Sequence, residues 1–135
     1  MENHSDISKN FIPYDLALEL KELGFEEPCF AFYGLSRDDY KTIRLSIFQN
    51  LKTDYLPDVH HLDVTCDAPL YQQAFRFFRA KYRYWVYVRE ASKEKCRFYI
   101  EKFDEKYFTS EIFHTYEEAE LECLVKLIEI CRKLK

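Results

Sequence analysis

The spacing of apolar positions along the chain predicts three helices. The first is expected over residues 13–23, with proline at its start and Gly24 where the chain turns with positive φ. The second is expected over about residues 69–82, because apolar side chains recur there every three or four positions. Its stripe consists of Tyr71, Ala74, Phe75, Phe78 and Tyr82. The third begins at Thr115, which forms a capping box with Glu118.

Between these helices the pattern changes to the period of two that is typical of strands. Residues 42–48 alternate most clearly, with Ile43, Leu45 and Ile47 on one face. Further strands are expected at 29–33, 61–65, 84–90 and 96–102. In the last of these, Cys96, Phe98 and Ile100 are expected to face the core. Residues 34–40 are interpreted as a turn and 49–60 as a long loop.

These elements predict an α+β fold, in which an antiparallel sheet is packed with three helices in the order α-β-β-(β)-α-β-β-α. A chain of 135 residues fits one domain, 1–135. Residues 1–11 are polar and are expected to be a flexible N-terminal segment. The two helix-then-strand halves share little sequence, so they give only weak support for an internal repeat.

The composition predicts a cytoplasmic protein without disulfides. Hydrophobic residues make up 47% of the chain, which is enough for a core. The 5 cysteines are odd in number and lack C-x-x-C spacing, so reduced thiols are expected. No apolar signal segment and no run of ~20 apolar residues occurs, so neither secretion nor a membrane span is expected.

Charge is unevenly distributed and gives the best functional lead. The chain has a net charge of −4, yet residues 71–102 carry nine Lys/Arg against three Glu. Arginine binds phosphates and aromatic rings stack on bases, so a ligand site is predicted where both residue types gather. The predicted site residues are Arg76, Arg79, Arg83, Trp85, Tyr87, Arg89, Arg97 and Tyr99. The alternative is that these arginines pair with carboxylates of the same chain.

Catalytic and metal chemistry have less support. The adjacent His60 and His61 point to opposite sides of an extended chain, so they do not converge on one metal. No nucleotide-binding P-loop, G-x-S-x-G or H-E-x-x-H motif occurs. We therefore expect no enzyme activity, no cofactor and no metal, with a small nucleotide-acting hydrolase as a remote alternative.

Three segments resemble a family of small uncharacterised proteins of phages and prophages of gut bacteria. They are FIPYDLALELKELGF at 11–25, APLYQQAFRFFRAKY at 68–82 and FHTYEEAELECLVKLIEI at 113–130. The resemblance carries no catalytic residues. It implies a phage setting, in which small proteins without enzyme motifs often counter host defences.

The expected function is therefore binding. The partner would be an anionic, nucleotide-like small molecule that is sequestered, or a host defence protein that is masked. A nucleic-acid-binding accessory protein is the alternative class. A homodimer is expected if a second copy covers the outward face of residues 84–90.

Overall fold

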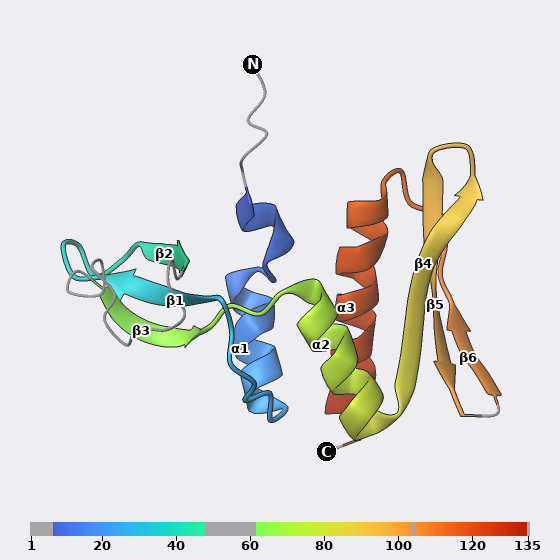
Figure 1. Cartoon of the computed structure of the whole chain (residues 1–135), viewed down its shortest axis with the longest axis horizontal. Coiled ribbons are helices and arrows are strands. Elements are labelled where there is room, and N and C mark those ends of the chain that lie inside the picture. The colour runs from blue at the N-terminus through green and yellow to red at the C-terminus, as the bar shows by residue number, and fades with distance from the viewer. Residues whose placement is uncertain (1–6, 48–61, 104, 135) are drawn as a thin grey trace. The chain divides into compact units, whose positions relative to one another are not determined.

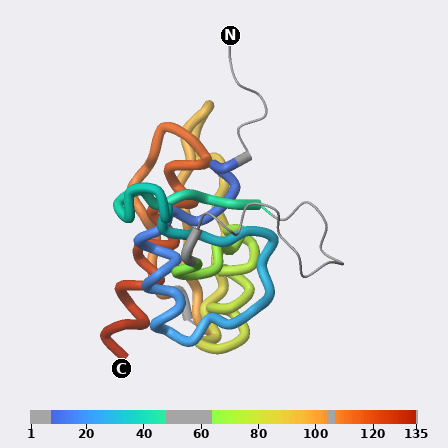
Figure 2. Tube along the Cα trace, turned by 90° about the vertical axis from the view of Figure 1, so that its left-hand side faces the viewer, coloured from blue at the N-terminus to red at the C-terminus, as the bar shows by residue number. Residues whose placement is uncertain are grey.

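The structure is a computed structural model that describes residues 7–47, 62–103 and 105–134, which are the coloured parts of Figures 1 and 2. Contacts divide the chain into two compact units, Met1–Leu70 and Tyr71–Lys135. The α+β class is confirmed, because the described residues form three α-helices and two three-stranded antiparallel sheets. The expectation of one domain over residues 1–135 stays a prediction.

The first unit contains a helix and a three-stranded sheet. Its elements are the 3-10 helix η1 (Ile7–Asn10), α1 (Tyr14–Glu22), β1 (Ala31–Ser36), β2 (Ile43–Ile47) and β3 (Leu62–Asp67). The strand order is β2-β1-β3, and both neighbours of the central β1 are antiparallel to it. Helix α1 packs against β3.

Helix α1 ends as its sequence predicts. Gly24 has a φ of 106°, which a residue with a Cβ adopts only at a cost. Its N–H donates to the Lys21 carbonyl at 3.0 Å, and the Phe25 N–H donates to the Leu20 carbonyl at 3.0 Å. This pair of bonds is the Schellman motif, which satisfies carbonyls left open at the end of a helix.

One expectation for the first unit is wrong. The turn expected from residue 34 begins later, because β1 continues to Ser36 and Gly34 pairs with strands on both sides. The flexibility expected of residues 1–11 stays a prediction; within that range Ile7–Asn10 form η1, and the buried Phe11 bridges to Leu70. The predicted loop at 49–60 lies outside the described residues.

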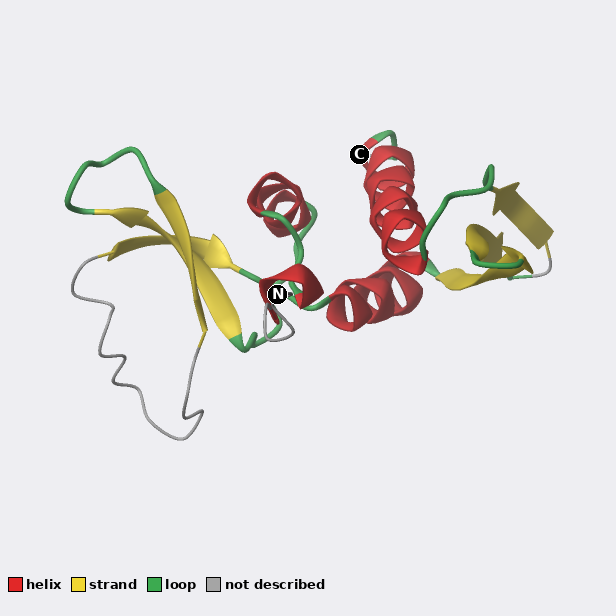
Figure 3. Ribbon diagram, turned by 90° about the horizontal axis from the view of Figure 1, so that it is seen from above, coloured by secondary structure: helices red, strands yellow, loops and turns green. Residues whose placement is uncertain are grey.

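The second unit places two helices on one side of a sheet (Figure 3). Its elements are α2 (Tyr71–Phe77), the π-helical turn η3 (Phe78–Tyr82), β4 (Tyr84–Ser92), β5 (Lys95–Lys102), β6 (Glu105–Thr109) and α3 (Tyr116–Arg132). The strand order is β4-β5-β6, with all pairs antiparallel. Helix α3 packs on β4 and β5.

The second predicted helix changes type within its length. It is α-helical over α2 and π-helical over η3, so the expected regular helix is wrong beyond Phe77, whereas Ala74 and Phe78 of the predicted stripe are buried. The consecutive Phe77 and Phe78 are both buried at this junction, with ring centroids 5.3 Å apart. Arg83 then ends the helix with a φ of 67°. Turns of this kind are frequent at functional sites.

The predicted hairpin is confirmed and a third strand is added to it. Cys96, Phe98 and Ile100 are buried, as the alternation predicts. The turn is tighter than expected, because β4 continues to Ser92 and Glu94 has a positive φ. Strand β6 was not predicted, and its short sequence Glu105–Thr109 lacks a clear alternation of apolar and polar residues.

Helix α3 begins at the expected cap. The Glu118 N–H donates to Thr115 Oγ1 at 3.0 Å, but Glu118 Oε1 accepts from the His114 N–H rather than from the threonine N–H that a capping box uses. The buried side of α3 includes Cys123, Leu124 and Leu127. Of the helices in the described ranges, none has the length and apolar character that crossing a membrane requires.

Candidate functional site: an aromatic and arginine face with an adjoining groove

Five of the eight predicted site residues lie on one face of the second sheet. Cross-strand partners share a face, and the register pairs Trp85 with Glu101, Tyr87 with Tyr99, and Arg89 with Arg97. We call these six residues the outer face. Helices α2 and α3 lie on the other side of the sheet, so within this unit no helix covers it (Figure 3).

An arginine and two tyrosines form the centre of the outer face. The rings of Tyr87 and Tyr99 are stacked, with centroids 5.0 Å apart and planes at 21°. The guanidinium carbon of Arg89 lies 5.1 Å from both centroids. A cation at this distance is attracted by the ring quadrupoles. The arrangement holds the arginine beside the rings rather than extended into solvent.

Carboxylates of the described residues form no ion pair with the arginines of the outer face. Its one acidic residue, Glu101, accepts a hydrogen bond of 2.6 Å from the Tyr87 hydroxyl, and this bond raises the pKa of that tyrosine. Within the described ranges, neither Arg89 nor Arg97 forms an ion pair with a carboxylate. The Arg97 Nε is buried and has no hydrogen-bond partner there. The face therefore offers donors to an anion.

The remaining three predicted residues lie around the helix that precedes the sheet. The Arg79 guanidinium carbon is 5.2 Å from the centre of the Trp85 ring, which joins Arg79 to the outer face although it comes from η3. Arg76 is exposed on α2. Arg83 is exposed at the left-handed end of η3, and it is not among the residues that line the groove described next.

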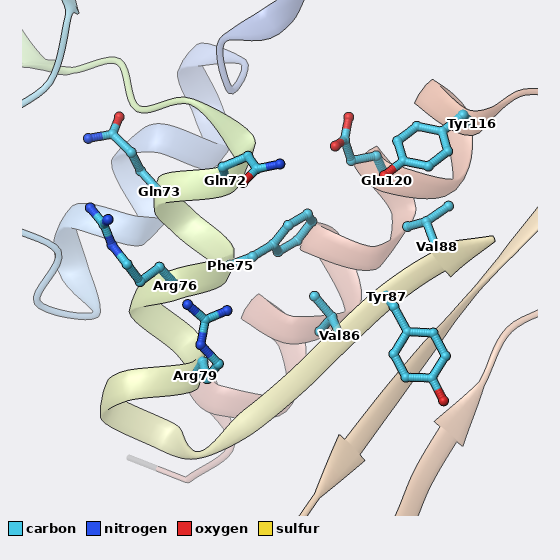
Figure 4. Close-up of a pocket in the computed structure, with 10 residues that line it drawn as sticks. All are labelled: Gln72, Gln73, Phe75, Arg76, Arg79, Val86, Tyr87, Val88, Tyr116 and Glu120. Atoms are coloured by element: carbon cyan, nitrogen blue, oxygen red, sulfur yellow. The ribbon is translucent and has the colours of Figure 1, made fainter.

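A groove of about 400 Å³ lies between α2, the start of α3 and strand β4. Figure 4 shows Phe75 pointing into this space and the Tyr87 ring pointing away from it. Tyr87 therefore contributes its backbone to the wall. The lining residues are Gln72, Gln73, Phe75, Arg76, Arg79, Val86, Tyr87, Val88, Tyr116 and Glu120.

Most of these groove residues were not predicted as a site. Phe75 and Tyr116 lie far apart in the sequence, and only the packing of the second unit brings them to one groove. Burial raises the pKa of Glu120, and the charge of Glu117 raises it further. Tyr116 also has a raised pKa, chiefly because it is partly buried and secondly because Glu120 is close.

The first unit has a groove of about 500 Å³ between α1 and β3, which contains no predicted site residue. Its one cation, Lys21, donates from Nζ to the Thr65 carbonyl at 3.1 Å. No group of three metal-ligating side chains occurs in the ranges that the structure describes. His60 and His61 lie outside those ranges.

Comparison with protein-family models, with curated proteins and with solved structures found no match in any of the three. The resemblance to a phage protein family therefore stays a prediction.

Proposed function

We propose that this chain is a non-enzymatic binding protein whose ligand is an anionic, nucleotide-like molecule held on the outer face. The observation that carries the proposal is the position of Arg89, 5.1 Å from the rings of both Tyr87 and Tyr99 and opposite Arg97 in the register. Like charges directly opposite on a sheet are destabilising. A bound phosphate between the two guanidinium groups would remove this repulsion.

The remaining side chains of the outer face suit the base of a nucleotide. Trp85 is 55% exposed, so its indole ring is accessible for stacking against a base. Arg79 lies against the same indole and adds a second cation within reach of the ligand. The guanidinium fork of arginine binds phosphate oxygens in pairs, which a lysine in its place would not reproduce.

The biological setting that we propose is phage counter-defence, with sequestration of a nucleotide-derived signal as the activity. The support is the family resemblance of the three sequence segments together with the arginines and rings of the outer face. Native mass spectrometry of the chain purified from phage-infected bacteria tests this setting. A retained nucleotide mass is expected, and a chain that carries no nucleotide from infected cells would contradict it.

A second candidate ligand is single-stranded nucleic acid. It is favoured by one observation, namely that the rings and arginines lie on the surface of a sheet rather than inside an enclosed cavity. Sheets that carry exposed aromatic residues bind unstacked bases in several RNA-binding modules. Affinity would then rise with the length of the strand and fall steeply with salt, because each phosphate contact releases counterions.

Trp85 provides the experiment, since it is the only tryptophan in the chain. Its fluorescence is titrated with a mononucleotide, a cyclic dinucleotide and oligothymidylates of increasing length, at two salt concentrations. Quenching that saturates with the mononucleotide or cyclic dinucleotide supports signal sequestration. Quenching only by the longer oligothymidylates assigns nucleic acid instead.

Two arginine variants decide whether the outer face is the site. Arg89→Ala is expected to weaken binding by about tenfold or more, which corresponds to ~1.4 kcal/mol. Arg44→Ala removes the same charge from exposed strand β2 of the first unit and is expected to leave binding unchanged. Equal affinities of the two variants would contradict the proposed site.

A further inference from the structure

Strand β4 is an edge strand whose outward backbone groups can be identified from its neighbours. On β5, Phe98 uses both of its backbone groups toward β6: its N–H donates to Ser110 Oγ at 2.9 Å and its carbonyl accepts from the Ser110 N–H at 3.0 Å. The backbone N–H and C=O groups of successive residues point to opposite edges of a strand. Those of Arg97 and Tyr99 therefore point toward β4. Their partners Arg89 and Tyr87 are thus the residues of β4 that bond to β5.

The residues between these positions point the other way. Val88 lies opposite Phe98 and Val86 lies opposite Ile100, so both direct their N–H and C=O groups away from β5. Among the described residues these four groups have no hydrogen-bond partner. They form two donor and acceptor pairs, spaced as an added strand requires.

This edge is open where edges of natural sheets are usually protected. Protection commonly comes from proline, from short strands or from bulges. Strand β4 has 9 residues, contains no proline and keeps a regular register up to Glu90, with its one irregularity between Glu90 and Ser92. Val86 and Val88 both line the groove, so the open edge forms one wall of it.

The opposite wall supplies side-chain contacts of defined chemistry. Alternate side chains of a strand added to β4 would point to the helix side, toward Phe75 and Arg79. Phe75 is half-buried and its ring points into the groove (Figure 4). Arg79 forms no ion pair with a carboxylate among the described residues. This wall therefore suits one apolar and one acidic side chain.

We propose that the groove binds an extended, acidic peptide segment of a partner protein, which adds to β4 as a fourth strand of the second sheet. Main-chain bonds to Val86 and Val88 supply the affinity, and the side chains of the helix wall supply the selection. This binding site adjoins the outer face and shares Arg79 with it, while the Tyr87 and Tyr99 rings lie on the other side of the sheet from the groove.

Charge favours a peptide over a second copy of this chain. Residues 71–135 contain 14 Lys/Arg and 11 Asp/Glu, a net charge of +3. In a dimer paired through two β4 edges, the two-fold axis would bring α2–η3 of one copy toward that of the other. Each carries Arg79 on its groove side, so like charges would approach. An acidic side chain of a peptide would instead pair with Arg79.

The experiment is a selection of random linear peptides on the full chain, followed by titration calorimetry with the enriched peptide. Enriched peptides are expected to contain Asp or Glu and to lack proline over about six residues, the usual length of a strand. A scan in which each backbone nitrogen of the peptide is methylated in turn is expected to weaken binding by about tenfold at alternate positions only. That alternation is specific to strand addition.

Matched variants of the chain complete the test. Val88→Pro removes an outward N–H without removing a bond to β5, and it is expected to abolish binding, whereas Val88→Thr keeps the N–H and binds as before. Arg79→Glu is expected to weaken binding of the acidic peptide by about tenfold, and Arg44→Glu is its control. The N-methyl scan keeps the proposal falsifiable if Val88→Pro does not fold.

Several outcomes would overturn the proposal. They are the absence of any enriched peptide, enrichment of basic peptides, a uniform N-methyl scan, or full binding by a folded Val88→Pro chain. Analytical ultracentrifugation of the unliganded chain tests one further outcome, which is self-association. A concentration-dependent dimer that Val88→Pro abolishes would assign the edge to a second copy instead of a peptide.

Discussion

Arg89 on β4 and Arg97 on β5 are direct cross-strand partners, so two positive side chains lie opposite each other on the outer face. The Arg97 Nε is buried there without a hydrogen-bond partner among the described residues. Both features cost free energy in the unliganded protein. A binding face commonly retains such a cost because the ligand relieves it.

The first prediction concerns this repulsion. Arg97→Gln is expected to raise the free energy of unfolding by about 0.2–1 kcal/mol in the absence of ligand, because it removes one of two opposed charges. The measurement is urea unfolding followed by Trp85 fluorescence, which reports on the second unit. This increase in the free energy of unfolding should be smaller at high salt, since salt screens the repulsion between the two arginines. Arg44→Gln is the control, and a loss of stability at low salt in Arg97→Gln would contradict the argument.

The second prediction follows from the raised pKa of Glu120, which burial causes first and Glu117 second. Because the folded protein holds this proton more tightly than the unfolded chain, ionisation of Glu120 destabilises the fold as pH rises through its folded pKa. Glu120→Gln is therefore expected to be more stable than the parent at neutral pH. The difference should vanish at a pH below the ordinary pKa of glutamate.

The control for Glu120 is the exposed Glu122 on the same helix. Glu122→Gln removes the same charge near the start of α3, so it accounts for the interaction with the helix dipole. Urea unfolding at a series of pH values checks both variants. A Glu122→Gln curve that matched that of Glu120→Gln would show that burial is not the cause.

The third prediction concerns the start of α3. Thr115→Ala removes the acceptor of the Glu118 N–H and is expected to lower the free energy of unfolding by about 1 kcal/mol. Thr115→Ser keeps the hydroxyl, so its free energy of unfolding is expected to fall by much less. The measurement is again urea unfolding, and equal losses in the two variants would refute the cap. Since Tyr116 and Glu120 line the groove, Thr115→Ala should also weaken peptide binding there.

The fourth prediction concerns the thiols. The five cysteines are free and buried. Burial raises the pKa of Cys29 to about 12 and that of Cys131 to about 11, so little thiolate is present near neutral pH. A thiol reagent at pH 8 is expected to react slowly with the native chain and to label all five positions rapidly in denaturant. Rapid labelling of the native chain would contradict the packing.

Local patterns in the sequence predicted the structure correctly where it depends on only a few neighbouring residues. Gly24 predicted the end of α1, and Thr115 predicted the start of α3, because caps depend on hydrogen bonds within one turn. The alternation of Cys96, Phe98 and Ile100 predicted the buried face of β5, because side chains alternate across any strand. Arg97, Tyr99 and Glu101 followed as the outward positions of the same alternation, whereas only the register with β5 decided that Trp85, Tyr87 and Arg89 share that face.

The sequence did not predict features that depend on which segments meet. The π-helical turn at Phe78–Tyr82 has no counterpart in the periodic pattern of the sequence, which predicted a regular helix there. Strand β6 forms because β5 offers it an edge, not because its own residues alternate. The groove brings together α2, α3 and β4, which no local pattern relates.

The sequence by itself therefore determined the helix ends, the α+β class and the side chains that share each face of a strand, since these depend on backbone geometry within a few residues. The tertiary structure alone decided that Arg89 lies against two rings and opposite Arg97, and that the backbone groups of Val86 and Val88 point away from β5 at the wall of a groove. The physical reason is that register and strand order are set by contacts between distant segments, and these contacts determine which donors are satisfied and which remain open.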